Sequence, residues 1–592
     1  MLGIWDGHDA GAALIRGGEI CVAVNEERLT RRKLEVGFPC LAIGACLKQA
    51  GLLPADVGTV AASTSDPAKT LTRLIPALRE EYYLIRRRKT APRRADPLRK
   101  AFKYRFTELP PNVLSRALSR RYLKGRLAQM GFVGTRIEMV DHHAAHASAA
   151  AACCGFEQAL VLTLDGVGDG LCGSFWIRRE GALTLLRALP ARTSLGIFFE
   201  HVTNLMNMRE LEDEGKVMAL ANYAYPIPDE ENPLLAVIGT RGLDIVSPFS
   251  STGMFRELKR VLWRFPSEQF AYMAQRALEK AVAGLVLEAL GRTGLKRLAV
   301  AGGVFSNVKM NMKLAELPEL ERLYVFPHMG DGGLAIGAAL AANRTLHGVT
   351  ACRLTDLYLG PGGPDREVSE TDDASPDTGS SGPAAGCGGT APGDGGDAGS
   401  LRMRRLDDPA AEAGRLILAG EIVLWFQGRM ETGPRALGHR SILARPDSRR
   451  LKDRLNLLLK KRVWYQPFCP SMLIEDAPAL LMTEGQEIRD NRFMTMGFRV
   501  RPEHLPLLEG VTNIDGTCRP QFVGDEEPRY RDLLVHLKGV LGYGVVLNTS
   551  FNLHGEPMVC APGEAVAMLR QTGIRYLILE DCLIENTHAE NP

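Results

Sequence analysis

The sequence lacks the features that mark several broad classes of protein. Its 592 residues include 72 Lys and Arg against 69 Asp and Glu, a formal net charge of +3, so no strong overall field attracts nucleic acid or an anionic membrane. No apolar run approaches the roughly 20 residues that a transmembrane helix needs. We therefore expect neither nucleic acid nor a membrane as a partner, and local groups of Arg and Lys must bind any anion.

Cysteine pairs with the C-x-x-C spacing and an N-terminal targeting segment are also missing. The twelve cysteines are scattered, and none shows the C-x-x-C spacing of a zinc ribbon, which fits a reduced protein. The chain opens with MLGIWD, without the basic and apolar regions of a signal peptide. We therefore expect a cytoplasmic protein.

What is present is the composition of a large globular protein, with 45% apolar and 24% charged residues. A chain of this length exceeds the size of one hydrophobic core. Residues 375–400 are rich in Gly, Ser, Pro, Ala and Asp and have no large apolar side chain, so they cannot form a core. We predict two domains, 1–365 and 403–592, joined by a flexible linker at 366–402. A closing strand near 354–359 would precede the linker, and a helix near Pro409 would follow it.

Three segments of the first domain share one pattern, an apolar strand that leads into a turn of Gly and Asp. The pairs are GIW with DGHD at residues 3–9, LVLTL with DG at 160–166, and LAV followed by GG at 298–303. Such turns present backbone N–H groups and a carboxylate at a strand end, which suits a phosphate and its cation. One Asp-Gly turn is equally typical of a hairpin. Three copies favour duplicated α/β halves around a nucleotide site.

A basic segment, 86–105, lies between the first two of these turns. The simplest interpretation is a solvated helical or loop insertion. Contact with a phosphorylated ligand or partner is the alternative.

Two histidines give the first indication of a metal site. Small residues with high helix propensity follow them, so His142 and His146 should lie one turn apart on one helical face. An i, i+4 imidazole pair is a metal half-site, and it lacks the Glu of the H-E-x-x-H metalloproteases. Histidines that serve only the core are an equally open interpretation of this motif alone. Asp165 and Asp331, in Gly-rich turns, are either turn formers or further ligands; two imidazoles and two carboxylates suit iron, zinc or manganese.

The second domain places arginines among residues that enforce turns. The string GRMETGPRALGHRS contains Arg429, Arg435 and Arg440, and Lys461 and Arg462 follow. Guanidinium groups held in this way form a cage for a multiply charged anion. Surface solubility is the competing interpretation.

A short apolar stretch at 545–547 leads into the string NTSFN at 548–552. This pattern predicts a strand that ends in neutral polar groups. Such groups would orient a small amide or carbamoyl unit.

Together these strings resemble the O-carbamoyltransferases of the nodulation-protein and antibiotic-biosynthesis type. The resemblance covers nearly the whole chain and implies an α/β fold, with a duplicated actin/sugar-kinase-like (ASKHA) Kae1-like domain followed by a YrdC-like α/β domain. The matching strings stand in the order expected of that family: Gly7-His8-Asp9-Ala10, Asn25-Glu26-Glu27-Arg28, His142 and His146, Asp165-Gly166, Glu214-Gly215-Lys216-Val217-Met218, Gly302-Gly303-Val304-Phe305-Ser306-Asn307, Gly330-Asp331, GPRALG and NTSFN.

The resemblance implies a reaction at two sites. Carbamoyl phosphate would be cleaved in the YrdC-like domain, and ATP would activate the resulting carbamate as carbamoyl-adenylate. The Kae1-like domain would transfer the carbamoyl group to a hydroxyl of a small-molecule acceptor, a sugar or natural product. The implied cofactor is a divalent metal, Fe²⁺ by resemblance, with ATP and Mg²⁺ as co-substrate. Transfer from a mixed anhydride needs groups that stabilise developing charge and an enclosed path.

Residue roles follow from matching positions. The metal ligands would be His142, His146, Asp165 and Asp331. His8 would lie beside the acceptor hydroxyl as a general base or orienting group, with Asp9 and Lys216 as further catalytic residues. The nucleotide would be bound by Gly166, Gly302, Gly303 and Asn307. Carbamoyl phosphate and the ATP phosphates would be bound by Arg429, Arg435, Arg440, Lys461, Arg462, Asn548, Ser550 and Asn552.

Two other functions stay open. A tRNA threonylcarbamoyl transferase-like enzyme would need a basic face for RNA, which segment 86–105 would supply. A second domain with its own arginine-rich site fits a small-molecule carbamoyltransferase better. A non-catalytic ASKHA nucleotide-binding regulator would give those arginines no role.

Overall fold

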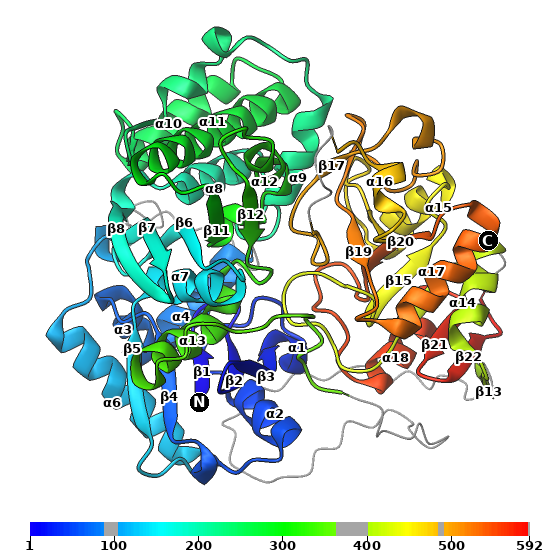
Figure 1. Cartoon of the computed structure of the whole chain (residues 1–592), viewed down its shortest axis with the longest axis horizontal. Coiled ribbons are helices and arrows are strands. Elements are labelled where there is room, and N and C mark those ends of the chain that lie inside the picture. Colours follow the sequence, from blue (N-terminus) through cyan, green and yellow to red (C-terminus); the bar gives the residue numbers. More distant parts are fainter. Residues whose placement is uncertain (88–104, 363–400, 484–489, 590–592) are drawn as a thin grey trace.

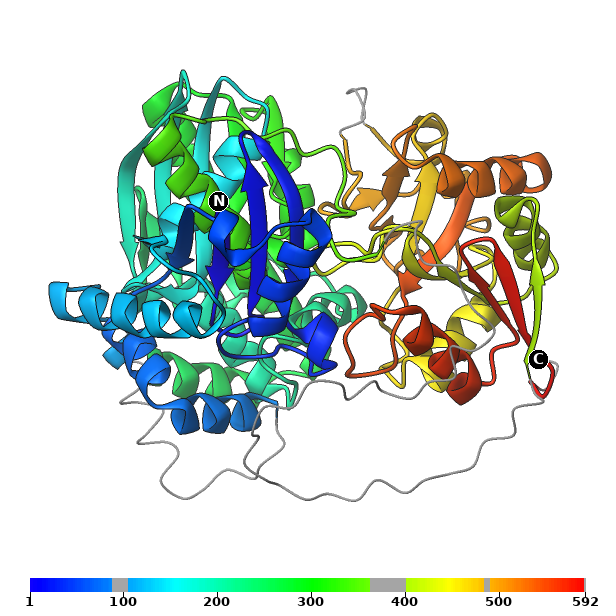
Figure 2. The same ribbon diagram turned by 90° about the horizontal axis from the view of Figure 1, so that it is seen from below.

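The computed structural model shows two α/β lobes that lie side by side (Figure 1, Figure 2). It describes residues 1–87, 105–362, 401–483 and 490–589. Almost all of the predicted linker at 366–402 and most of the basic segment at 86–105 lie outside the described residues.

The N-terminal lobe begins with a five-stranded sheet. Its strands are β1 (Leu2–Trp5), β2 (Gly11–Arg16), β3 (Glu19–Asn25), β4 (Thr59–Ser63) and β5 (Arg136–Val140), in the order β3-β2-β1-β4-β5. The first three strands form an antiparallel meander, and β4 and β5 continue the sheet in parallel. The predicted strand at residues 3–5 is therefore confirmed.

A second sheet repeats this topology. Its strands are β6 (Gln158–Gly168), β7 (Leu171–Arg179), β8 (Ala182–Pro190), β11 (Arg297–Ala301) and β12 (Arg322–Val325), in the order β12-β11-β6-β7-β8. Again three antiparallel strands are followed by two parallel ones. The predicted α/β fold with duplicated halves is confirmed, because the two sheets share one strand order.

Two helices lie back to back between these sheets. Helix α7 (His142–Cys153) packs on the second sheet and helix α13 (Leu334–His347) on the first, and their shared core is rich in alanine. A side chain at Gly337 of α13 would place its Cβ 2.3 Å from the carbonyl oxygen of Ala145, so the two backbones touch directly. This contact fixes the start of α7 between the two sheets.

Further helices cover the outer faces of both sheets. On the second sheet these include α8 (Leu195–Leu205), α10 (Ser251–Leu262) and α11 (Ser267–Thr293). On the first sheet they include α2 (Cys40–Ala50) and α6 (Val113–Gln129). A membrane-spanning helix needs length and apolar composition together, and none in the described part of the chain has both.

The C-terminal lobe is built on one mixed sheet with the strand order β13-β22-β21-β14-β15-β20-β16-β19. The strands are β13 (Leu401–Arg405), β14 (Val423–Phe426), β15 (Arg440–Ala444), β16 (Cys469–Leu473), β19 (Gln521–Val523), β20 (Val545–Ser550), β21 (Tyr576–Leu579) and β22 (Cys582–Asn586). Helices α14 (Pro409–Leu418) and α17 (Pro528–Leu541) cover one face. The predicted helix near Pro409 and the strand at 545–547 are therefore confirmed.

The predicted closing strand at 354–359 is wrong, because this segment forms no strand. Its carbonyl groups bind two different lobes. The Leu359 carbonyl accepts from the N–H of Ala23 at 2.9 Å, and the Leu357 carbonyl accepts from the N–H of Thr432 at 2.8 Å. Since these partners lie in separate lobes, no regular ladder forms, and the segment ties the lobes together instead.

Candidate active site between the lobes

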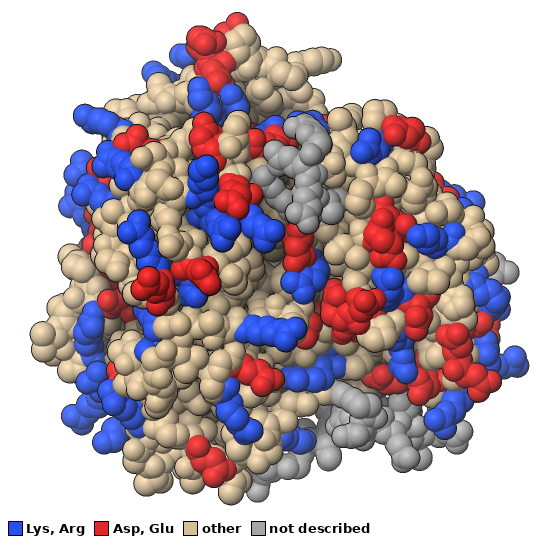
Figure 3. All heavy atoms as spheres, viewed as in Figure 1, with Lys and Arg blue, Asp and Glu red and all other residues tan. Residues whose placement is uncertain are grey.

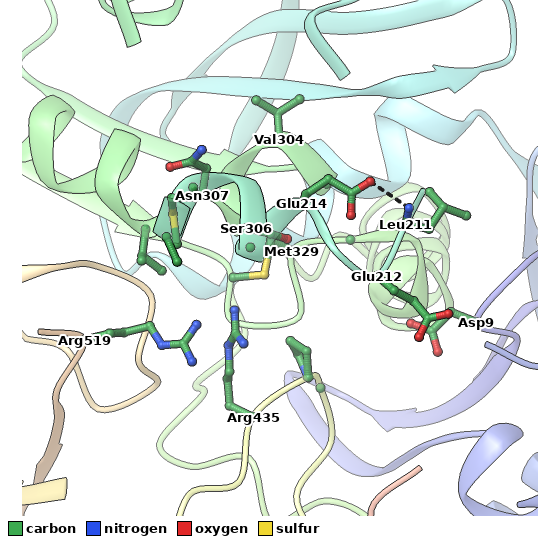
Figure 4. A pocket seen from close by; sticks show the side chains of 18 of the residues that line it. Asp9, Leu211, Glu212, Glu214, Val304, Ser306, Asn307, Met329, Arg435 and Arg519 are labelled. Atoms are coloured by element: carbon green, nitrogen blue, oxygen red, sulfur yellow. Dashed lines mark hydrogen bonds between the residues drawn. The ribbon is translucent and has the colours of Figure 1, made fainter. Parts of the chain in front are cut away.

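A cavity of about 480 Å³ lies between the lobes and is lined by both of them. The structure brings together ten of the predicted site residues on its walls: His8, Asp9, Asp165, Gly166, Gly303, Asn307, Asp331, Arg435, Ser550 and Asn552. In Figure 4 the side chains of Arg435 and Arg519 extend from the C-terminal lobe toward Ser306 and Asn307 of the N-terminal lobe. The strand ends of one lobe therefore face the arginine loop of the other across one space.

The four predicted ligands converge beside this cavity, and Asp165 and Asp331 line it. One ligand atom from each of His142, His146, Asp165 and Asp331 lies within 4.8 Å of every other. The Nε2 atoms of His142 and His146 lie 3.4 and 3.2 Å from Oδ2 of Asp165. Both Nε2 atoms also lie 3.6 Å from Oδ1 of Asp331.

These separations fit a shared metal ion. Ligand atoms that each lie about 2.1 Å from one ion are roughly 3.0–3.4 Å apart at the angles of octahedral or tetrahedral sites. The observed separations of 3.2 to 3.6 Å between imidazole nitrogens and carboxylate oxygens are close to this range. Two imidazoles and two carboxylates are a donor set for a divalent transition metal.

The surroundings of His142 hold its ring in this orientation. Its backbone N–H donates to Oδ2 of Asp169 at 2.7 Å, and its Nδ1 lies 3.1 Å from Oγ1 of Thr64. A Cβ at Gly168 would lie 2.1 Å from the ring, so only glycine leaves room for it. A partner on the second ring nitrogen is what orients metal-binding histidines in general. His143, between the pair, instead contacts Oγ1 of Thr163 at 2.9 Å.

The predicted catalytic residues His8 and Asp9 lie beside this group. Nδ1 of His8 is 3.2 Å from Oδ2 of Asp331, and the indole N–H of Trp5 donates to the His8 carbonyl at 2.7 Å. Asp9 adopts a left-handed backbone conformation with φ of 58°. Burial, with the nearby carboxylate of Glu27, raises the pKa of Asp9 to about 8. Both side chains reach the cavity.

Lys216, the third predicted catalytic residue, is placed differently. Its Nζ forms an ion pair with Oδ1 of Asp213 at 2.9 Å, and it is not among the described residues that line the cavity. Its neighbours Glu214 and Gly215 do line it. The predicted segment therefore lies at the cavity, but the side chain of Lys216 does not face it.

The predicted nucleotide-binding residues form tight turns at the strand ends. Gly302 has φ of 106°, and a Cβ there would lie 2.1 Å from the carbonyl oxygen of Leu164. The Asn307 amide is engaged within the lobe, because Oδ1 accepts from the N–H of Met310 at 3.0 Å and Nδ2 donates to Gln275 at 2.7 Å. Gly302 thus forms a tight turn behind the wall, and Asn307 lines the cavity with its amide already hydrogen-bonded within the lobe.

Among the wall residues of the N-terminal lobe that the sequence did not single out are His328 and Asn25. Nε2 of His328 contacts Oδ1 of Asn25 at 2.9 Å, and burial lowers the pKa of His328 to about 3, so its ring is neutral. Asn25 also donates to the carbonyl of Asp9 at 3.0 Å. Their only signal in the sequence is their position, since Asn25 begins the family string at 25–28 and His328 precedes Asp331 by three residues.

In the C-terminal lobe one carboxylate organises the arginine loop. Oε1 of Glu431 accepts the backbone N–H groups of Leu437, His439 and Arg440 at 2.7, 2.9 and 3.1 Å. These bonds close residues 431–440 into a compact turn from which Arg435 projects into the cavity (Figure 4).

Arg435 is held there without a partner. None of the described residues forms an ion pair or a hydrogen bond with it, and its buried Nε is unsatisfied. Burial and the neighbouring guanidinium of Arg519 lower the pKa of Arg435 to about 9. Two converging guanidinium groups without an acid between them suit a phosphate group. Arg519, which donates to the Cys469 sulfur at 3.0 and 3.2 Å, was not predicted, because no turn motif surrounds it.

The other predicted arginines of this loop serve the protein itself. Arg440 is fully buried, donates to the carbonyls of Gln427 and Gly428 at 2.6 and 3.0 Å, and stacks 3.5 Å above the Phe426 ring. Arg429 donates to the carbonyls of Gly360, Cys21 and Leu359 at 2.9, 2.9 and 2.7 Å, which links both lobes. Neither is among the described residues that line the cavity.

The basic residues 460–462 also differ in their exposure and in their partners. Lys461 is exposed, and Arg462 donates to Oδ1 of Asn456 at 2.7 Å. The buried residue is Lys460, whose Nζ donates to Oδ1 of Asn552 at 2.9 Å, and burial lowers the pKa of Lys460 well below its usual value. A π-helical turn at Leu455–Leu459 precedes it and shifts the side-chain register.

The residues of the string at 548–552 also differ in whether they reach the cavity. Ser550 and Asn552 line the cavity, whereas Asn548 is buried behind it. Its Nδ2 donates to the carbonyl of Ala436 at 3.2 Å and to Oγ of Ser471 at 2.9 Å. Asn548 thus supports the arginine loop from behind.

Comparison with known proteins identifies the family. Residues 1–235 and 247–340 match the family described as carbamoyltransferase N-terminus, and residues 414–586 match the carbamoyltransferase C-terminus. The chain belongs to the carbamoyltransferase family. The resemblance inferred from the sequence is therefore confirmed.

This carbamoyltransferase is similar in sequence to nodulation proteins and to an enzyme named as an O-carbamoyltransferase. It is 32% identical to the nodulation protein NolNO of Sinorhizobium fredii, over 98% of this chain and 79% of that protein. It is 32% identical to the nodulation protein NolO of Bradyrhizobium diazoefficiens, over 76% of this chain and 79% of that protein. The 3'-hydroxymethylcephem-O-carbamoyltransferase of Streptomyces clavuligerus is 26% identical, over 70% of this chain and 74% of that enzyme.

Among solved structures, component A of (R)-2-hydroxyglutaryl-CoA dehydratase from Acidaminococcus fermentans matches with a TM-score of 0.34 and 15% identity, over 58% of this chain and 98% of that one. Full-length HypF in its phosphate- and nucleotide-bound form matches with a TM-score of 0.31 and 13% identity, over 59% of this chain and 56% of that one.

The convergent ligand set predicts metal binding that depends on particular histidines. We expect His146→Ala to lower the metal content of the purified, folded protein by about tenfold or more, because changes around such sites already cost 10- to 100-fold in affinity. Elemental analysis after gel filtration measures this. His143→Asn is the matched control and should keep its metal, and equal loss in both variants would contradict the assignment.

The turn closed by Glu431 predicts a positioning role for that residue. In Glu431→Gln the neutral amide oxygen accepts weaker bonds than the carboxylate, so Arg435 loses its fixed place. We expect the dissociation constant for inorganic phosphate, measured by calorimetry, to rise about tenfold, equivalent to about 1.4 kcal/mol. The exposed Glu475→Gln is the control. Phosphate affinity equal to that of the unaltered protein would contradict the role.

Proposed function

We propose that this carbamoyltransferase forms carbamoyl-adenylate from carbamoyl phosphate and ATP and transfers the carbamoyl group to a hydroxyl of a small-molecule acceptor. The observation that carries the proposal is the interlobe cavity, which has the guanidinium groups of Arg435 and Arg519 on the wall of one lobe and four potential metal ligands at the other lobe. Carbamate decomposes readily, so its passage between two sites requires an enclosed path.

The first half-reaction would use the C-terminal wall. Water would attack the phosphorus of carbamoyl phosphate, the bond from phosphorus to the carbamate oxygen would break, and inorganic phosphate and carbamate would form. Arg435 and Arg519 would bind the phosphate oxygens and stabilise the charge that develops in this step. The carbamate oxygen then attacks the α-phosphorus of ATP, a new P–O bond forms, and pyrophosphate leaves. Lys460 would act indirectly, because its hydrogen bonds hold Asn552 at the cavity wall.

The second half-reaction would take place at the N-terminal wall. The acceptor oxygen would bond to the carbamoyl carbon, the bond from that carbon to the adenylate oxygen would break, and AMP would leave. His8 would orient the hydroxyl or take its proton, and Asp9 would hold a proton nearby. A divalent ion held by His142, His146, Asp165 and Asp331 would supply Lewis-acid stabilisation of oxygen charge; Fe²⁺ is the expectation from resemblance, and Mg²⁺ would accompany ATP.

A small-molecule acceptor is favoured over tRNA. One relative is named as a carbamoyltransferase of 3'-hydroxymethylcephem, a small molecule. On the face shown in Figure 3, basic and acidic side chains are interspersed, whereas RNA binding favours a continuous basic surface. Most of the segment that would dock RNA, 86–105, lies outside the described residues. A non-catalytic regulator would leave the unpaired Arg435 without a role.

The two walls predict two separable defects. We expect Arg435→Ala to lower carbamoyl-adenylate formation by about 10²–10³-fold, since it removes charge stabilisation. We expect His8→Ala to keep carbamoyl-adenylate formation and lower transfer to an acceptor by about 10²–10⁴-fold. Radiolabelled carbamoyl phosphate with ATP, in an acceptor screen without RNA, measures both steps.

The exposed Arg402→Ala is the control for both variants. Carbamoyl-adenylate formation that strictly requires tRNA would overturn the small-molecule assignment. Loss of both steps in His8→Ala would contradict the division of the reaction between two walls.

A further inference from the structure

A second cavity, of about 330 Å³, lies in the N-terminal lobe outside the proposed active site. Its walls include the rings of Phe38 and Tyr122 and the side chains of Arg79 and Arg126. This volume is within the range of small-molecule sites, which combine apolar walls with a few polar groups. The described residues that line it and those that line the interlobe cavity do not overlap.

Arg79 is packed into this cavity without a partner. A Cβ at Gly37, where φ is 128°, would lie 2.7 Å from Cζ of Arg79, so the guanidinium rests in a space that only glycine provides. None of the described residues forms a hydrogen bond or ion pair with this guanidinium. All five of its N–H groups are therefore available to a ligand.

Arg126 also has unused donor capacity. One Nη atom donates to Gln129 at 3.1 Å and the other to the Cys40 sulfur at 3.4 Å, while the buried Nε has no partner. The guanidinium lies 5.3 Å from the centre of the Phe38 ring. A buried donor without a partner costs stability that a bound acceptor would recover.

The acidic groups of this cavity are engaged elsewhere. The Glu26 carboxylate accepts the N–H groups of Leu41 and Ala42 at 3.0 and 2.6 Å, at the start of α2. The Glu35 carboxylate accepts from the N–H of Val36 at 2.9 Å and lies 3.5 Å from Arg32. Neither carboxylate forms an ion pair with Arg79 or Arg126, so the free groups here are donors.

We propose that this cavity binds a small organic anion whose phosphate or carboxylate group is held by Arg79 and Arg126. Its apolar part would lie against Phe38 and Tyr122. Guanidinium groups recognise these oxyanions through paired N–H bonds, and an oxyanion accepts hydrogen bonds without donating them, which matches a site with spare donors.

The wall of this cavity connects it to the proposed active site. Residues 35–37 line the second cavity, and their backbone pairs with the turn that carries His8. The N–H of Ala10 donates to the carbonyl of Glu35 at 3.0 Å, and the N–H of Gly37 donates to the carbonyl of Gly7 at 3.3 Å. An anion that fixes this strip therefore changes the carbamoyl transfer rate, a consequence that rests on the proposed function.

The binding claim is tested on the full chain with inorganic phosphate and citrate as separate probes. Binding is measured by calorimetry on the Arg435→Ala protein, because this substitution removes the unpaired arginine of the interlobe cavity. We expect at least one probe to bind, and we expect Arg79→Ala or Arg126→Ala, added to that background, to raise its dissociation constant tenfold or more. Arg120→Ala, exposed on the same helix as Arg126, should leave it unchanged. No binding, or binding insensitive to both changes, overturns the site.

The two probes identify the ligand class, since citrate alone indicates carboxylates and phosphate alone indicates phosphates. With Arg435 intact, Arg79→Ala should keep the basal carbamoyl transfer rate and lose any change caused by the anion. An anion that binds without changing the transfer rate overturns the coupling. Failure of the proposed function would appear as absent carbamoyl-adenylate and would leave the binding result intact.

Discussion

The direct contact between α7 and α13 is the constraint on which the rest of the structure depends. Small residues let the two backbones touch between the sheets, with Gly337 against the carbonyl of Ala145. The first two turns of α7 carry His142 and His146, and the turn that begins with Asp331 leads into α13. A larger side chain in this contact would separate the starts of the two helices. Close packing between the sheets therefore determines the geometry of the four proposed metal ligands.

The second lobe completes the site through its attachment. Arg429 of the C-terminal lobe binds the carbonyl of Cys21 in the N-terminal lobe, and the segment at 354–359 forms hydrogen bonds with each lobe. This attachment brings the loop organised by Glu431 over the strand ends of the N-terminal lobe. One protein surface would therefore bind phosphate while the facing surface would receive the carbamoyl group.

The spacing of residues along the chain predicted much of the fold and of the candidate site. It did not predict the direction in which each side chain points. His142 and His146 could be paired because helical geometry relates residues four apart. The arginine string predicted an anion-binding loop, yet the sequence could not show that Arg435 faces the cavity while Arg429 bonds to backbone carbonyls. Lys460 was missed because a π-helical turn, which has no sequence signal, precedes it. The strand order was predictable only as a repeat, since pairing across a sheet depends on distant segments.

The central claim is that the carbamoyl unit passes between the lobes without leaving the protein. Isotope dilution tests it most directly: labelled carbamoyl phosphate and ATP react in a solution that contains excess unlabelled carbamate, and the specific radioactivity of the carbamoyl-adenylate is measured. The account predicts that it equals that of the carbamoyl phosphate. A value diluted toward that of the carbamate in solution would contradict it.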